Sequence, residues 1–227
     1  MIFPIGDDNI IGGHKPLVAY SFLGFNIAVF LFELSLSQSQ CEWFMTQYGV
    51  IPTEISAGQD LFTIITSMFM HGGWMHLIGN MIFLWIFADN IEAVVGSFGF
   101  LVFYLLGGVV ASLIHVVFNL GSTVPSIGAS GAISAVMGAY LVMFPKSRIK
   151  VIVLIFFFTF HLSAIAFLGI WFIQQLFSGI GSLNAQVGSG GVAWWAHIGG
   201  FLYGVLAGFV LKNIYGHRYN YGKRENV

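Results

Sequence analysis

The sequence predicts an all-α polytopic membrane protein, and three observations lead to this class. The chain has 227 residues, of which 57% are hydrophobic and only 7% are charged, whereas about a quarter of the residues of a soluble domain are charged. Its mean hydropathy is +0.87. Apolar stretches of roughly 20 residues, long enough to cross a bilayer, recur along its whole length. We therefore expect one membrane domain over residues 1–227, surrounded by lipid.

Six membrane-spanning helices are expected. The second begins at residue 61 or 74, depending on whether the pair Gly72-Gly73 interrupts it. The stretch before residue 166 is apolar but too short for a further span, so it is interpreted as an interfacial or re-entrant segment. Residues 1–15 form a polar lead-in and 213–227 a tail. The expected spans are 16–34, 61 or 74 to 87, 98–118, 130–144, 167–180 and 192–211.

The basic residues predict the orientation of these helices. All eight lie in three groups, which the positive-inside rule places in the cytoplasm. Both termini are then cytoplasmic, and the connections 36–60, 119–127 and 181–191 face outward. No cleaved signal peptide is expected, and the short termini favour a bacterial or archaeal plasma membrane. The groups are Lys15; Lys146, Arg148 and Lys150; and Lys212, Arg218, Lys223 and Arg224.

A serine between small residues stands where an outer loop becomes an apolar helix. Gly128 and Gly131 flank Ser130 and allow a sharp turn and a close approach, and free N–H groups at a helix start stabilise negative charge. His197 lies at the same outer depth in another span and can serve as a base. The simpler interpretation of His197 is a buried, hydrogen-bonded histidine, but the matching serine favours a nucleophile–base pair.

Small residues form a stripe on each of these two helices. One stripe contains His197, Gly200, Gly204 and Gly208, and the other contains Ser130, Ser134 and Gly138. Small residues at every fourth position let helix backbones approach closely in lipid. The two helices are therefore expected to pack together, as a Ser–His hydrogen bond of about 3 Å requires.

A third group of polar residues begins the second span. His76 and Asn80 are four residues apart and share one helix face, where both can donate hydrogen bonds to a developing oxyanion. A zinc site built on His71 and His76 is the alternative, but the sequence offers no Asp, Glu or Cys at that depth. Because no carboxylate is available to orient His197 either, a Ser–His dyad is favoured over a triad.

These segments, in this order, resemble the rhomboid family of intramembrane serine proteases. The matching stretches are His71 to Asn80, Gly128-Ala129-Ser130-Gly131 and Ala196-His197-Ile198-Gly199-Gly200. The resemblance implies a six-helix core with Ser130 as nucleophile and His197 as general base and then acid. It also implies an oxyanion hole of His76, Asn80 and the Ser130 backbone N–H, supported by His71, Gly128 and Gly131. Transmembrane proteins would be the substrates, and no metal, cofactor or nucleic acid is implied.

Two departures from the family pattern stand out. Many members carry a Trp-Arg pair in the first outer loop, where this chain has Glu42-Trp43 and no arginine. Some place a tyrosine four residues after the nucleophile, where this chain has Ser134, so His197 must be packed or bonded differently. An inactive rhomboid-like protein that binds membrane helices is the main alternative, and a small transporter or channel is a third. The roles of Glu33, His115 and His161, the substrate and the oligomeric state stay open.

Overall fold

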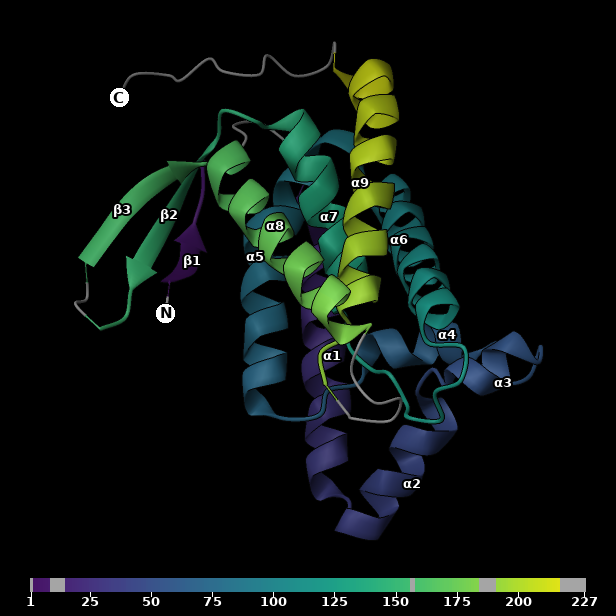
Figure 1. Ribbon diagram of the computed structural model, residues 1–227. Helices are drawn as coiled ribbons and strands as arrows, with labels where there is room; N and C mark the ends of the chain where they lie inside the picture. The colour runs from purple at the N-terminus through teal and green to yellow at the C-terminus, as the bar shows by residue number, and fades with distance from the viewer. Residues whose placement is uncertain (1, 9–14, 156–157, 184–190, 217–227) are drawn as a thin grey trace.

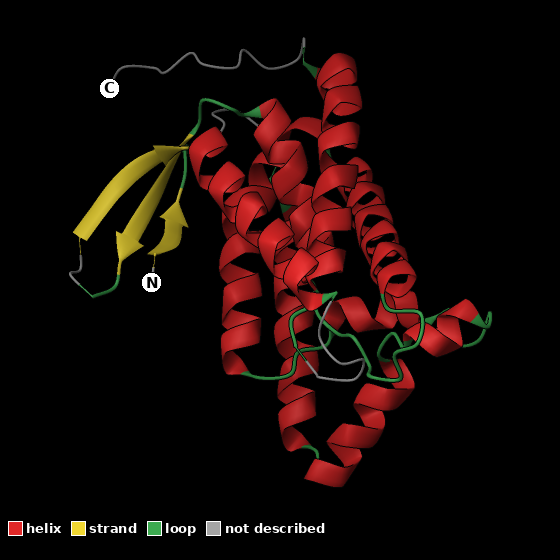
Figure 2. Ribbon diagram, in the orientation of Figure 1, coloured by secondary structure: helices red, strands yellow, loops and turns green. Residues whose placement is uncertain are grey.

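The computed structural model describes residues 2–8, 15–155, 158–183 and 191–216. It is a helical bundle with a small sheet at one side (Figures 1 and 2). Five of the described helices are long and apolar enough to cross a membrane. This confirms the polytopic helical class. They are α1 (Leu17–Ser35), α5 (Trp74–Val95), α6 (Ser97–Phe118), α8 (Ala164–Ser182) and α9 (Trp194–Tyr215).

The remaining apolar helix, α7 (Ser130–Met143), has 14 residues and lies inside the bundle among the longer helices (Figure 1). Nearly all its side chains are buried, as expected for a helix that is apolar on every side. It corresponds to the short fourth span expected from the sequence. Because of its length, we report five candidate spans and one shorter apolar helix among the described residues.

Helices α7 and α9 are in closer contact than any other pair of elements. A Cβ atom on Gly200 would lie 2.1 Å from the Gly131 carbonyl oxygen, and one on Gly204 would lie 1.9 Å from the Ala135 carbonyl oxygen. Gly208 approaches the α7 backbone at Ala139 in the same way. The small-residue stripes therefore form the interface that their spacing predicted. This contact sets the separation of the two helix starts.

Short helices occupy the long connection between α1 and α5, at one end of the bundle (Figure 1). The sequence predicted this connection without its helices. The first of them begins with a capping box, in which Ser37 and Gln40 satisfy each other's backbone N–H groups. The elements are α2 (Gln38–Tyr48), α3 (Pro52–Ser56), α4 (Thr63–Thr66) and the 3₁₀ turn η1 (Ser67–Phe69).

Helix α5 begins at Trp74, directly after the Gly72-Gly73 pair, so the pair does end the preceding segment. The expected end at residue 87 was wrong, because the helix continues to Val95. Glu92, in the part of the helix beyond residue 87, is fully buried, and its carboxylate accepts hydrogen bonds from the backbone N–H groups of Val18 and Ala19 at 3.0 and 2.7 Å. It thereby satisfies the unpaired donors at the start of α1.

A three-stranded antiparallel sheet corrects the expectation of a purely helical chain. Strands β2 (Arg148–Val153) and β3 (Phe158–Ser163) pair with each other, and β1 (Ile2–Gly6) pairs with β2. The interfacial segment before residue 166 is thus a hairpin, and part of the lead-in is a strand. Buried Ile149 and Val151 alternate with exposed Arg148 and Lys150, so the sheet packs one face on the bundle.

Asp7 connects this sheet to the helices. Its carboxylate accepts hydrogen bonds from the Tyr140 hydroxyl of α7 and, at 2.7 Å, from the Asn90 amide of α5. Burial raises the pKa of Asp7 from 3.8 to about 7, an effect that the hydrogen bond from Tyr140 reduces and the nearby charge of Asp89 increases. The neutral acid is therefore the favoured form at this contact.

We expect the protein to become less stable as the pH rises through about 7. Because the pKa of Asp7 is higher in the folded protein than in the unfolded chain, its contribution is complete below 3.8 and is lost as the carboxyl ionises. Each 1 kcal/mol lost lowers the melting temperature of a protein of this size by roughly 2–4 °C. Thermal unfolding in detergent at pH 5 and pH 8 measures the effect. Asp7→Asn should make this pH step smaller, whereas Asp8→Asn should retain it in full; an unchanged step in Asp7→Asn would contradict the assignment.

Candidate active site

Ser130 is the first residue of α7, and backbone hydrogen bonds to two other segments fix the loop before it. Ser126 and Val50 exchange backbone hydrogen bonds of 2.8 and 2.9 Å, and the Gly128 N–H donates to the Ser67 carbonyl at 2.8 Å. Gly128 has a φ of +126°, a conformation that residues with a side chain rarely adopt. These contacts fix where the Ser130 side chain leaves the backbone.

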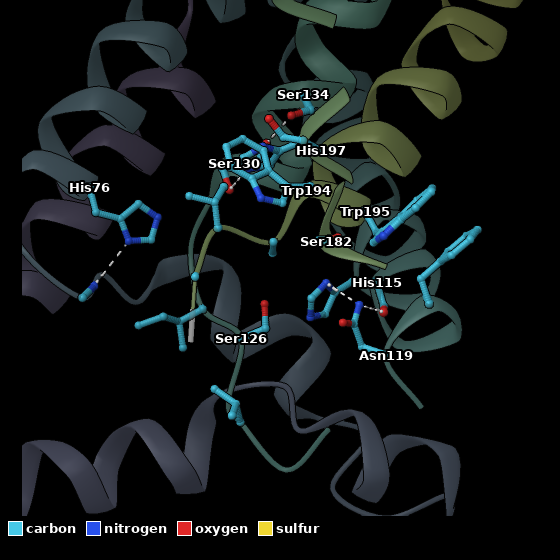
Figure 3. Close-up of a pocket in the computed structure, with 18 of the residues that line it drawn as sticks. His76, His115, Asn119, Ser126, Ser130, Ser134, Ser182, Trp194, Trp195 and His197 are labelled. Atoms are coloured by element: carbon cyan, nitrogen blue, oxygen red, sulfur yellow. Dashed lines mark hydrogen bonds between the residues drawn. The ribbon is translucent and has the colours of Figure 1, made fainter. Parts of the chain in front are cut away.

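His197 lies in the first turn of α9 and meets Ser130 directly. Its Nε2 atom is 2.8 Å from Ser130 Oγ, and its Nδ1 atom is 2.9 Å from Oε1 of Gln175 in α8. The rings of Trp171 and Trp194 lie 6.0 and 6.1 Å from the imidazole, centroid to centroid. Figure 3 shows Ser130, His197 and Trp194 grouped at one end of the pocket. The structure thus brings together the two residues that the sequence singled out, at hydrogen-bonding distance.

Gln175 was missed by the sequence analysis. It is buried within a mostly apolar membrane helix, and a buried polar side chain in such a helix is itself a signal of function. Ser134, at the position where other members carry tyrosine, donates to the Ser130 carbonyl oxygen instead of contacting the imidazole. The ring of His197 is therefore held by an amide and two indoles.

Gly131 has a packing role beside the nucleophile. A Cβ atom there would lie 2.7 Å from the Ala111 side chain of α6 and 3.7 Å from that of Ala196 in α9. The absence of a side chain lets three helices approach one another at the depth of Ser130.

His76, in the first turn of α5, lies beside the loop that precedes Ser130. His76 Nδ1 accepts a 3.4 Å hydrogen bond from the Gly72 N–H, and a Cβ atom placed on Gly128 would lie 2.6 Å from His76 Nε2 and 3.7 Å from Ser130 Oγ. The His76 ring therefore packs directly against the loop before Ser130, and it occupies space that a side chain at position 128 would need. The ring lies at the edge of the pocket in Figure 3.

Asn80 and His71 form a buried pair next to His76. Asn80 Nδ2 is 3.0 Å from His71 Nε2, and the His71 backbone N–H donates to the Glu33 carboxylate at 3.2 Å. Glu33, whose role the sequence left open, thus fixes the segment before α5 from the end of α1. The rings of His71 and His76 lie 5.0 Å apart, edge to face. In the part of the chain that the structure describes, no group of three or more His, Cys, Asp or Glu side chains is placed to hold a metal ion.

A cavity of about 1110 Å³, lined by both polar and apolar residues, connects these groups. His76, Asn80, Ser130 and His197 all line it, together with residues of the 119–127 loop and of the start of α9. Its volume slightly exceeds the range of about 300–1,000 Å³ usual for ligand sites. The cavity leaves room for a peptide segment and water beside Ser130.

The remaining histidines are placed differently. His115 also lines the cavity, and Asn119 donates to its backbone carbonyl at 2.8 Å (Figure 3). His161 lies in β3, opposite Lys150 and away from the cavity. The expected outer loop 181–191 falls mostly on residues 184–190, which lie outside the described residues.

Gly128→Ala is expected to reduce the activity of this site by about 10²-fold or more. The new Cβ atom would lie 2.6 Å from the His76 ring at a φ of +126°, so either the ring or the Ser130 loop must move, and small displacements of catalytic groups cost about this factor. Initial rates of peptide-bond cleavage, the activity that the resemblance implies, would measure the loss. Gly24→Ala in α1, where a Cβ atom meets nothing within 4 Å, is the matched control. Equal rates for both variants would contradict the close approach.

The fold and the site define a class of protein: a helical membrane protein with a serine–histidine pair inside the bundle, facing a cavity. The sequence model of the Rhomboid domain matches residues 58–214, more than half of the chain. The chain therefore belongs to the rhomboid family.

Three curated relatives illustrate the similarity. Rhomboid protein 1, mitochondrial, of Saccharomyces cerevisiae is 29% identical over 88% of this chain and 54% of its own length. Rhomboid protease GluP of Bacillus subtilis is 32% identical over 59% of this chain and 26% of its own. Presenilin-associated rhomboid-like protein A, mitochondrial, of Danio rerio is 34% identical over 40% and 24%.

The matched region spans about half or less of these relatives. Two of them are named as mitochondrial and one comes from a bacterium. Because mitochondrial proteins are among these relatives, the expectation of a prokaryotic plasma membrane is not supported. The apolar helices indicate an integral membrane protein without specifying which membrane.

Proposed function

We propose that this chain is an intramembrane serine endopeptidase that cleaves transmembrane segments of other membrane proteins. The observation that carries the proposal is the 2.8 Å contact between Ser130 Oγ and His197 Nε2, beside a cavity inside a membrane protein. A serine hydroxyl is a weak nucleophile until an adjacent base accepts its proton, and His197 is in position to do so.

The reaction follows from the placement of these groups. His197 Nε2 takes the hydroxyl proton as Ser130 Oγ attacks the peptide carbonyl, and the imidazolium then donates that proton to the leaving amine. The acyl-enzyme that remains is hydrolysed by water, which His197 activates in the same way. The described chemistry uses groups of this protein and water and requires no metal or cofactor.

The oxyanion would be stabilised by three donors: His76, Asn80 and the Ser130 backbone N–H. Asn80 carries two N–H donors, and its contact with His71 uses one of them and orients the amide. The Ser130 N–H belongs to the first turn of α7, where N–H groups have no partner within the helix and favour negative charge. Such donors, fixed before the reaction, stabilise the transition state most.

The substrate is a membrane-spanning helix that unwinds near the outer surface. Its backbone must open because a helix satisfies its own hydrogen bonds and shields its carbonyls, so small or helix-breaking residues favour cleavage. It enters beside α8 or the loop that follows. The start of β2 and the last turn of α9, which carry basic residues, lie near the end of α7, whereas Ser130 is its first residue (Figure 1). This separation supports six spans with both termini cytoplasmic and an outward-facing site.

Cleavage of a model single-pass protein in liposomes tests this function. The purified protein is expected to cut the substrate within its membrane segment, at a peptide bond near the outer surface, as located by mass spectrometry of the products. Binding of the substrate without cleavage, together with an unreactive Ser130, would replace the proposal by an inactive protein that binds membrane helices.

A further inference from the structure

A neutral histidine can act as a base toward Ser130 only in one of its two tautomers. Nε2 must be unprotonated to accept the hydroxyl proton, so the ring proton must be on Nδ1. In serine proteases of other folds an aspartate fixes this tautomer. The groups at hydrogen-bonding distance from the His197 ring are Ser130 on one side and Gln175 on the other, within the described residues.

The second contact of Gln175 decides which end of its amide faces His197. Its Nε2 atom donates to the Trp171 backbone carbonyl at 3.3 Å, one turn earlier in α8. A flipped amide would place two carbonyl oxygens against each other at this point. The Oε1 atom therefore faces His197, and an amide oxygen can only accept a hydrogen bond. His197 Nδ1 must be the donor.

Packing holds Gln175 at this position. Phe172 stacks on Phe201 of α9 with ring centroids 4.4 Å apart, and a Cβ atom on Gly179 would lie 2.8 Å from the Ile198 side chain. These contacts lie on either side of Gln175 along α8 and fix its register against α9. Gln175 itself is only 4% exposed, and a buried amide without partners is costly.

We propose that Gln175 is the positioning residue for His197: it keeps the ring proton on Nδ1 and directs Nε2 at Ser130 Oγ. This inference rests on the proposed function. When His197 takes the serine proton, the amide oxygen accepts a hydrogen bond from the resulting imidazolium. A neutral partner also avoids placing an isolated carboxylate inside the membrane, where charge is costly. The Ser130–His197 pair thus has a third, uncharged member, Gln175, which is supplied by a different helix.

Three glutamine variants test the role of the acceptor oxygen. Gln175→Met keeps the volume but offers no comparable acceptor, whereas Gln175→Glu keeps an oxygen at the same reach. Gln174→Met is the matched control, because Gln174 is adjacent but exposed. The expected result is a kcat about 10- to 100-fold lower for Gln175→Met with little change in KM, as for the loss of one hydrogen bond to a buried group. Gln175→Glu should recover most of the loss, and Gln174→Met should match the wild type.

The tautomer itself gives a readout that packing alone would not change. In protein labelled with ¹⁵N-histidine, the His197 signals, assigned by their loss in His197→Ala, should show a protonated Nδ1 in the wild type and a mixture in Gln175→Met. A protonated Nε2 in the wild type, wild-type kcat in Gln175→Met, or equal losses in the Met and Glu variants would each overturn the inference. Failure of the wild type to cleave would instead overturn the proposed function, and the tautomer would still be measured.

Discussion

Ser130→Ala is expected to abolish cleavage, with a loss of at least about 10⁴-fold, because alanine offers no nucleophile and the remaining groups cannot form an acyl-enzyme. The fold should survive. The variant loses one partly buried hydrogen bond, that between Ser130 Oγ and His197 Nε2, which contributes about 1 kcal/mol. Cleavage of the model substrate in liposomes and thermal unfolding in detergent measure the two effects.

A serine elsewhere in the membrane region controls for the substitution itself. Ser21 lies on α1 and donates to the Leu17 carbonyl, exposed and away from the cavity. Ser21→Ala should cleave at the wild-type rate. Residual cleavage by Ser130→Ala above about 1% of wild type would show that another nucleophile carries the reaction.

The second large effect is expected at the oxyanion hole. His76→Ala and Asn80→Ala should each lower kcat by about 10²–10³-fold, the loss seen when one preorganised donor is removed. KM should change less, because these donors act mainly on the charge that develops in the transition state. Steady-state kinetics on the same substrate separate the two parameters.

Asn26→Ala is the control for removing a buried amide. Asn26 lies in α1, where it donates to the Phe22 carbonyl at 2.7 Å and does not line the cavity. The Asn26→Ala variant should keep the wild-type kcat even if it is less stable than the wild type. A rise in KM without a fall in kcat for Asn80→Ala would assign Asn80 to substrate binding and contradict its place in the oxyanion hole.

The interface that places Ser130 beside His197 could be predicted from the sequence. Gly200 and Gly204 follow His197 at spacings of three and four residues, and Ser134 and Gly138 follow Ser130 at spacings of four. That spacing depends only on the periodicity of the helix and on the close approach that small residues permit. The structure bears out the packing of α7 on α9. The catalytic roles of the two residues stay predictions.

The sheet was not predicted, because only part of its signal is local. Polar and apolar residues alternate at 148–151 and at 158–163, a period of two that indicates strands, but the continuously apolar run 151–158 between them suggested an interfacial segment instead. Strand β1 is supplied from residues 2–6, far away in the sequence, and Pro4 opposite Val151 gave no sign of a strand. Only the tertiary pairing makes these segments strands.

The same reason explains the side chains that were overlooked or left without a role. Gln175 has a meaning only through its contacts with His197 and Trp171, and Glu33 only through the His71 backbone. Each joins a helix to another segment whose relative placement the sequence does not specify. A polar residue in an apolar helix predicts that a partner exists, but its identity follows from the packing.

The central claim, that His197 activates Ser130, is tested most directly by labelling with a fluorophosphonate probe, which reacts with activated serines. We expect the wild type to be labelled at Ser130, as located by peptide mass spectrometry, and His197→Ala to react at least about 10²-fold more slowly, since general-base catalysis contributes about 10²–10⁴-fold. Labelling that does not depend on His197, or no labelling of Ser130 in the folded wild type, would contradict the account.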